Sequence, residues 1–186
     1  MKNALINIQN EMYDKGIWGH FTPEENMHLT LAFIGEYPDT VPVTEALEAV
    51  AFTPFDLALE GLGCYGDLWW AGVKDSAPLE AVVRRIRRAL ADNGIPFDRK
   101  KFSPHITLIR KARGEMPGLR PETAGMTVNR ISLMRSDRGE KRHDLYGSRR
   151  ILAFVRAKIE ILKWNLRVPN LNEFPLELFF YWLAKG

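Results

Sequence analysis

Two short stretches of the sequence are nearly the same: NMHLTLAFIG at residues 26–35 and FSPHITLIRK at residues 102–111. Each contains His, an apolar residue, Thr and Leu in that order, within a mostly apolar run. Short apolar runs that end at Gly or at charged residues predict β-strands. The chain has only four histidines, and two of them stand in these matching contexts. The repeat therefore predicts two similar halves, each with one such strand.

The spacing within each stretch decides which side chains lie together. On a strand, side chains alternate between faces, so His28 and Thr30 share one face, as do His105 and Thr107. The imidazole and the hydroxyl of each pair lie about 7 Å apart, at a rise of about 3.3 Å per residue. The intervening leucine or isoleucine faces the core. If the two strands lie side by side, four polar groups meet at one place.

This set of groups is suited to phosphodiester chemistry without a metal. Two imidazoles can divide acid–base work, because histidine titrates near neutral pH: one takes a proton from water and the other protonates a leaving oxygen. Two hydroxyls can donate hydrogen bonds to phosphoryl oxygens, where charge builds up in the transition state. A single His-x-Thr on a strand is weak evidence and is better explained by packing, and it is the repetition that favours a function.

Composition limits the class of protein. The chain of 186 residues is long enough for one substantial domain or two small lobes around a shared core. A formal charge of +3 fits a phosphate-bearing partner. Cys64 is the single cysteine, which excludes an intrachain disulfide and a Cys-based zinc site and predicts a cytoplasmic protein. The first residues lack a signal-peptide pattern, and no apolar run is long enough to span a membrane.

The remaining sequence alternates between helix and strand patterns. The most regular helix follows Ser76 as a potential N-cap, has Pro78 in its first turn and is followed by Gly94. Helices are expected over residues 2–14, 43–51 and 76–94, and strands over 27–35, 55–62, 68–73, 102–110 and 126–136. This order predicts an α+β fold in which helices back mostly antiparallel sheets.

The two motifs also carry a family resemblance. HLTLAFIGE at 28–36 and SPHITLIR at 103–110, with LWWAGV between them in the expected order, resemble the signature of the 2H phosphoesterase superfamily. Within it, the resemblance is to the RNA 2′,3′-cyclic phosphodiesterases, also called 2′-5′ RNA ligases, and it covers roughly residues 2–136. It implies a bilobed fold with pseudo-two-fold symmetry and a central cleft that carries both motifs.

The resemblance also implies an activity, hydrolysis of RNA 2′,3′-cyclic phosphate ends to 2′-phosphates with no metal and no cofactor. His28 would then be the general acid for the leaving 3′ oxygen, and His105 the general base for water. Thr30 and Thr107 would hold the phosphate, and 2′-5′ ligation would use the same groups. The expected partner is RNA with cyclic ends, tRNA-like fragments included, acted on by a monomer.

Several alternatives stay open. Arg110 is either a phosphate contact or a solvated strand end, since its odd offset from His105 takes it off the His/Thr face of an ideal strand. At most one of Trp69 and Trp70 can face a bound base, and core packing explains both. Four arginines between residues 84 and 88 either steer RNA or form the wet face of a helix. The rival functions are a phosphodiesterase for a small cyclic phosphate and a non-catalytic RNA- or nucleotide-binding domain.

The two ends of the sequence depart from the family pattern. We expect residues 1–140 to form the domain, with the family's short first strand missing ahead of the first helix, and residues 141–186 to form an atypical tail. Codons that encode GEKRHDLYGS, residues 139–148, can read Glu-Lys-Asn-Gly-Met-Ile-Tyr-Thr-Glu one base later, a turn followed by an alternating strand. This suggests a change of reading frame near residues 139–141. If the tail is genuine, a helix is expected around 151–164.

Overall fold

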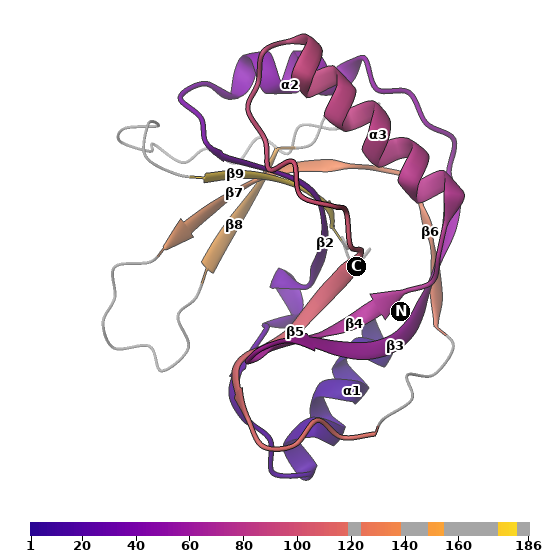
Figure 1. Ribbon diagram of the computed structural model, residues 1–186, viewed down its shortest axis with the longest axis vertical. Coiled ribbons are helices and arrows are strands. Elements are labelled where there is room, and N and C mark those ends of the chain that lie inside the picture. Colours follow the sequence, from indigo (N-terminus) through magenta and orange to yellow (C-terminus); the bar gives the residue numbers. More distant parts are fainter. Residues whose placement is uncertain (119–123, 139–148, 155–174, 182–186) are drawn as a thin grey trace.

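The structure, a computed structural model, describes residues 1–118, 124–138, 149–154 and 175–181, and from residue 135 onward it describes the backbone alone. Across these ranges the chain forms three α-helices, one short 3₁₀ helix and nine strands (Figure 1). The helices are α1 (Lys2–Asp14), η1 (Glu24–Asn26), α2 (Thr40–Glu48) and α3 (Ala77–Asp92). The strands are β1 (Trp18–Phe21), β2 (His28–Glu36), β3 (Phe55–Tyr65), β4 (Leu68–Val73), β5 (His105–Arg113), β6 (Gly125–Val128), β7 (Ser132–Arg138), β8 (Arg149–Phe154) and β9 (Pro175–Tyr181).

The strands form one curled sheet in which every pairing is antiparallel, in the order β6-β3-β4-β5-β2-β9-β7-β8, with β1 paired to β5. Figure 1 shows α1 on one side of the curl and α2 beside α3 on the other. The predicted α+β class, with antiparallel strands backed by helices, is confirmed. The two halves share a continuous run of strands through β5 and β2.

The two motif strands are neighbours near the middle of this run. β2 and β5 pair through Leu29 and Ile106, and β4 lies on the other side of β5. Leu29, Leu31, Ile106 and Leu108 are buried, as the alternation predicted. Burial of these apolar side chains anchors both strands in the core and leaves the opposite face of each strand for the polar residues.

The helices have the predicted amphipathic character. In α3 the Ser76 hydroxyl accepts a hydrogen bond from the backbone N–H of Leu79 at 3.3 Å, which caps the first turn. Its apolar stripe is fully buried and consists of Leu79, Val82, Val83, Ile86 and Leu90. α2 begins at Thr40, earlier than expected, because Asp39 provides an N-cap that accepts from the backbone N–H of Val41.

The expectation of one strand over residues 126–136 is wrong. The segment is divided into β6, which pairs with β3, and β7, which pairs with β9 and β8. Alternation along a segment is the same for one strand or for two, so the sequence pattern does not show where the chain changes its partner. β1 was not predicted either, since a four-residue strand contains too few positions for a periodic pattern.

Two strands come from the segment beyond residue 140. β8 pairs with β7, and β9 lies between β2 and β7. The helix expected around 151–164 is therefore wrong over residues 151–154, and the rest of that range lies outside the described residues. The point at which we expect a frame change, residues 139–141, also lies outside them. Within the described part of the chain, no helix has the length and apolarity to cross a membrane.

Candidate active site

The pairing of β2 with β5 brings the two His-x-Thr motifs together. Leu29 lies opposite Ile106 in an antiparallel pair, so continuing this register sets His28 level with Thr107 and Thr30 level with His105. Each histidine of one strand thus faces the threonine of the other. We call the side of the sheet that carries these four residues the motif face.

Both histidines are held in the same way. The Nδ1 atom of His28 lies 2.6 Å from the carbonyl oxygen of Asn26, and the Nδ1 atom of His105 lies 2.8 Å from that of Ser103. A carbonyl oxygen can only accept, so each Nδ1 carries the hydrogen and donates it. The Nε2 atom of each ring is therefore the one that gains or loses a proton. The two contacts have the same offset of two residues, and the repeat thus extends beyond the motif itself.

A bulge in β5 changes the position expected for Arg110. The pairing of β5 with β4 advances by two residues between Thr107 and Ile109 while β4 advances by one. Leu108 and Ile109 are consequently both buried, at 0% exposure each, and Arg110, the next residue, is exposed. An extra residue reverses the alternation of faces, which returns Arg110 to the motif face. The odd offset of Arg110 from His105 therefore does not take it away from the two motifs.

β2, the strand of the first motif, contains a bulge at the corresponding place. The pairing of β2 with β9 skips one residue between Thr30 and Ala32, and both Leu31 and Ala32 are buried. Phe33 then takes the position in β2 that Arg110 takes in β5, and it is 40% exposed. The two strands thus share the histidine, the threonine and the bulge, but they differ in the residue that follows the bulge.

Trp69 and Trp70 lie on opposite faces of β4 and differ in burial. Trp69 is buried in the core at 5% exposure, whereas Trp70 is half-buried and pairs with Thr107. The Trp70 ring centroid lies 5.9 Å from that of His105, and its indole covers Gly63, where a methyl group would overlap it. Its buried Nε1 has no hydrogen-bond partner among the described residues. Core packing therefore accounts for Trp69, and Trp70 belongs to the surroundings of His105.

Tyr65 completes an aromatic wall beside His105. Its ring meets the imidazole edge-on, with centroids 5.4 Å apart and planes at 82°, and it lies 5.3 Å from the Trp70 ring. The Tyr65 hydroxyl and the Ser103 hydroxyl are hydrogen-bonded at 2.8 Å. Tyr65 lies between the strands expected over residues 55–62 and 68–73 and was not predicted as a site residue; the available signal was an aromatic residue next to the strand that carries Trp70.

The four arginines of α3 each contact another group of the protein. Two form ion pairs one turn apart on their own helix, and two donate to backbone carbonyl groups of neighbouring segments. The contacts are Arg84–Glu80 and Arg88–Asp92 at 3.5 Å each, Arg85 to the Ala51 oxygen at 2.8 Å and Arg87 to the Lys100 oxygen at 3.0 Å. This favours the interpretation of the run as a helix surface over its interpretation as an RNA-steering patch.

The motif face offers proton-transfer groups together with hydrogen-bond donors. Within the described residues, the hydroxyls of Thr30 and Thr107 have no side-chain hydrogen bond, and Thr107 is only 8% exposed. Groups of three His, Cys, Asp or Glu that could hold a metal ion are absent from the same part of the chain. Two Nε2 atoms and two hydroxyls on one face can together bind a tetrahedral anion and transfer protons at opposite sides of it.

Comparison with known proteins identifies the family of the chain. The model of the 2′-5′ RNA ligase superfamily matches residues 18–140. The chain therefore belongs to the 2′-5′ RNA ligase superfamily, as its motifs indicated.

Named relatives are more specific. A protein of Geobacillus stearothermophilus named RNA 2′,3′-cyclic phosphodiesterase is 43% identical over 124 residues, which are 60% of this chain and 38% of that protein. One of the same name from Aeropyrum pernix is 30% identical over 128 residues, 64% of this chain and 73% of that protein.

Solved structures share the fold. A crystal structure of E. coli LigT complexed with 3′-AMP aligns with a TM-score of 0.67 at 22% identity, covering 82% of this chain and 86% of that one. The crystal structure of TT0787 of Thermus thermophilus aligns with a TM-score of 0.67 at 25% identity, covering 82% and 87%. The expected fold family is thus confirmed over most of the chain.

Proposed function

We propose that this protein hydrolyses the 2′,3′-cyclic phosphate at the end of an RNA to a 2′-phosphate. The observation that carries the proposal is the antiparallel register of β2 and β5, which sets each histidine level with the threonine of the other motif. The names of the relatives from Geobacillus stearothermophilus and Aeropyrum pernix support the same chemistry.

In the proposed reaction, the two histidines act on opposite sides of the phosphorus. Nε2 of His105 takes a proton from water as the water oxygen bonds to phosphorus. The bond from phosphorus to the 3′ oxygen breaks, and Nε2–H of His28 gives its proton to that oxygen. The products are a 2′-phosphomonoester and a free 3′-hydroxyl. The Nδ1 contacts of both rings support these roles, because they leave each Nε2 available for proton transfer.

Thr30 and Thr107 would donate hydrogen bonds to the two non-bridging oxygens, and Arg110 would neutralise part of their charge. Two observations support this. The strand register places each threonine opposite the histidine of the other motif, and the bulge in β5 returns Arg110 to the motif face. A 5′-hydroxyl in the place of water would form a 2′-5′ linkage with the same groups. The proposed setting is a monomer that acts on RNA ends in the cytoplasm, which the single cysteine and the formal charge of +3 support.

The test is hydrolysis of a short RNA with a 2′,3′-cyclic phosphate, in EDTA, with the position of the product phosphate determined. We expect a 2′-phosphate product that is lost in His28→Ala and in His105→Ala. Arg88→Ala, which changes an exposed side chain of α3 outside both motifs, should retain the activity. A 3′-phosphate product, or activity that EDTA abolishes, would contradict the mechanism.

The same experiment separates the rival functions. A protein that melts cooperatively, binds the RNA and leaves the cyclic phosphate intact is a binding domain. Equal rates on the RNA and on a nucleoside 2′,3′-cyclic phosphate would favour the phosphodiesterase for small cyclic phosphates.

A further inference from the structure

The segment of residues 95–104 lies between α3 and β5 and leads directly into His105. It contains three consecutive cationic residues, Arg99, Lys100 and Lys101. The site described above does not use them. In Figure 1 the segment runs from the end of α3 toward the start of β5.

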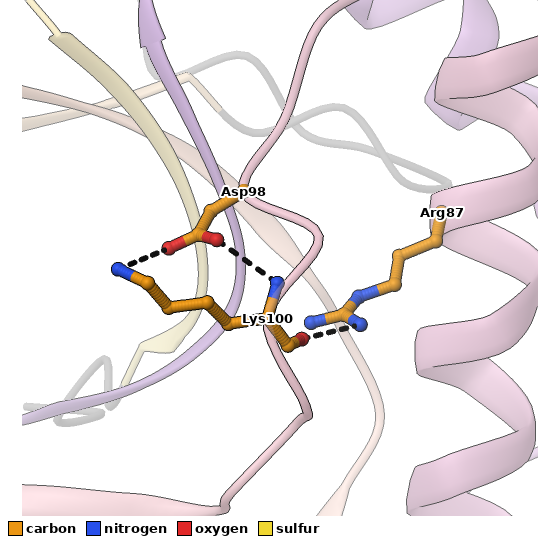
Figure 2. A network of polar contacts seen from close by, with 3 residues as sticks. All are labelled: Arg87, Asp98 and Lys100. Atoms are coloured by element: carbon orange, nitrogen blue, oxygen red, sulfur yellow. Dashed lines mark hydrogen bonds and ion pairs between the residues drawn. The ribbon is translucent and has the colours of Figure 1, made fainter.

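The backbone of this segment is held on two sides. The N–H of Asp98 donates to the carbonyl oxygen of Phe33 in β2 at 2.8 Å. On the other side, Nη1 of Arg87 in α3 donates to the carbonyl oxygen of Lys100 at 3.0 Å. Between them, the Asp98 carboxylate accepts from the N–H of Lys100 at 2.9 Å and pairs with its ammonium group at 3.3 Å (Figure 2). These hydrogen bonds fix the backbone that carries the three cations to β2 and to α3.

Arg87 is the partly buried member of the arginine run on α3, whereas Arg85, which also donates to a backbone carbonyl group, is exposed. Arg84 and Arg88 pair with carboxylates of α3, and their side chains are 69% and 84% exposed. The Nε atom of Arg87 is buried, and its guanidinium is directed to the backbone of the segment, as Figure 2 shows. This hydrogen bond from a partly buried arginine to a backbone carbonyl group holds the segment against α3.

The charges of the segment are available to a ligand. Among the described residues, Arg99 and Lys101 form no ion pair, whereas Lys100 pairs with Asp98. The Arg99 guanidinium lies 5.5 Å from the centroid of the Phe97 ring, which orients it through a cation–π contact. Lys101 lines a pocket of about 460 Å³ together with Ser103, the residue that holds the His105 ring, and the same pocket is lined by the acidic residues Asp75 and Glu80.

The chemistry of the proposed substrate limits what such charges can meet. A 2′,3′-cyclic phosphate occupies the 3′ end of an RNA, so the rest of the polymer extends only in the 5′ direction. Any contact beyond the terminal nucleotide is therefore with nucleotides on its 5′ side, and cationic side chains there would meet their phosphates. Lys101 is four residues before His105 and lies within about 13 Å of it along the chain, at no more than about 3.3 Å per residue.

Resting on the proposed function, we infer that Arg99, Lys100 and Lys101 bind the phosphates of the nucleotides on the 5′ side of the cyclic end. They select polymeric RNA ends over cyclic mononucleotides, while the motif face carries out the reaction. Contacts with phosphates depend on charge and not on base identity, so the segment confers length preference without sequence preference.

The test compares two substrates that share the 3′-terminal nucleotide, a nucleoside 2′,3′-cyclic monophosphate and a hexanucleotide with a 2′,3′-cyclic end. The variant is Arg99→Ala/Lys101→Ala. The matched control is Lys15→Ala/Arg88→Ala, which removes the same charge from the exposed end of α1 and from the surface of α3. We expect the segment variant to raise KM for the hexanucleotide about 10-fold, with kcat/KM for the mononucleotide unchanged, and the control to change neither.

Salt provides a second readout that does not need turnover. Binding of the hexanucleotide product, with its 2′-phosphate end, is measured by fluorescence anisotropy between low and moderate salt. Each lost phosphate contact should reduce the slope of log K against log salt by about 0.7 for a single strand. The segment variant should therefore show a slope shallower by about 1.4, and the control variant the slope of the unaltered protein.

Other outcomes would overturn the inference. An equal loss on both substrates would mean that the segment positions His105 and does not bind RNA. An unchanged KM and an unchanged slope would mean that it has no contact with the polymer. If the unaltered protein hydrolyses neither the hexanucleotide nor the mononucleotide, the proposed function fails. The salt slope still decides the inference about the segment in that case.

Discussion

The two motif strands, β2 and β5, are alike in backbone and different in surroundings. Both contain His-x-Thr, both hold the histidine by a carbonyl group two residues earlier, and both have a bulge after the threonine. β5 lies against β4, so that His105 touches the aromatic wall of Tyr65 and Trp70. β2 lies between β5 and β9, and after its bulge Phe33 takes the position of Arg110.

The comparison shows how a repeated motif can serve two roles. The shared features orient both Nε2 atoms in the same way, which is what a symmetric site requires. In the proposed mechanism an acid and a base must nevertheless differ, so we expect the difference to come from residues outside the repeat. The candidates are the aromatic wall and Arg110 on the second strand, and Phe33 on the first.

The largest effect is expected from the histidines. His28→Ala and His105→Ala should each lower kcat by about 10²–10⁴-fold, because each removes one proton transfer. A cyclic substrate with sulfur in place of the 3′ bridging oxygen separates the two roles, since a thiolate leaves without a general acid. On that substrate His28→Ala should recover most of its rate, whereas His105→Ala should not.

The variant whose rate recovers on this substrate identifies the general acid. Recovery of His105→Ala, with His28→Ala still inactive, would exchange the assigned acid and base. Equal recovery of both variants would contradict a division of roles between the strands. Circular dichroism should show that both variants remain folded, because neither side chain is in the core.

The next largest effect is expected from the threonines. Thr107→Val and Thr30→Val keep the shape of the side chain and remove the hydroxyl. Each should lower kcat/KM by about 10–100-fold through loss of one donor to the developing charge. Thr→Ser at either position should retain most of the rate. A Val variant as active as the unaltered protein would remove that threonine from the site.

A smaller effect should follow from crowding the aromatic wall. In Gly63→Ala the added methyl group would overlap the Trp70 indole, which contacts His105. We expect a loss of about 1–3 kcal/mol in the free energy of unfolding, together with a lower kcat. Gly118→Ala, where the methyl group meets open space, is the matched control and should change neither. An unaltered kcat in Gly63→Ala would show that the wall does not position His105.

The smallest effect concerns Asp98. Its pKa is lowered chiefly by the hydrogen bond from the backbone N–H of Lys100, with a further contribution from the Lys100 ammonium group. A carboxyl group with a folded pKa below its unfolded value of about 4 stabilises the protein above that pH, and the contribution is lost as the pH falls. Asp98→Asn should therefore melt slightly below the unaltered protein at neutral pH, and the difference should vanish in acid. A difference in melting temperature that is independent of pH would contradict this origin.

The segment after residue 140 provides a further prediction. The family match ends at residue 140, close to the expected change of frame at residues 139–141. We propose that DNA sequencing across these codons will yield a frame that continues as a turn followed by an alternating strand. An intact frame with other codons would instead make β8 and β9 genuine strands of a domain that extends beyond residue 140.

Much of the fold followed from local patterns. The buried stripe of α3, its Ser76 cap and the buried leucines of both motifs depend only on periodicity and on nearest neighbours along the chain. The division of residues 126–136 into β6 and β7 did not follow, because the choice of partner strand depends on residues far away in the sequence.

The residues around the motifs also divide into features that the local pattern predicts and features that depend on residues far away in the sequence. Alternation alone requires Trp69 and Trp70 to face opposite sides, but only the core determines which of them is buried. A bulge is a feature of the pairing between two strands, so the return of Arg110 to the motif face was not visible in its spacing from His105.

The sequence by itself determined which groups this protein can bring to a phosphate: two imidazoles and two hydroxyls, each pair on one face of its strand. That follows from the fixed alternation of side chains along a β-strand. Only the tertiary structure decided that the pairs face each other, that one histidine lies against an aromatic wall and that three cations lead up to it. Those relations join segments distant in the chain, and they depend on which apolar faces pack together and on the register that packing imposes.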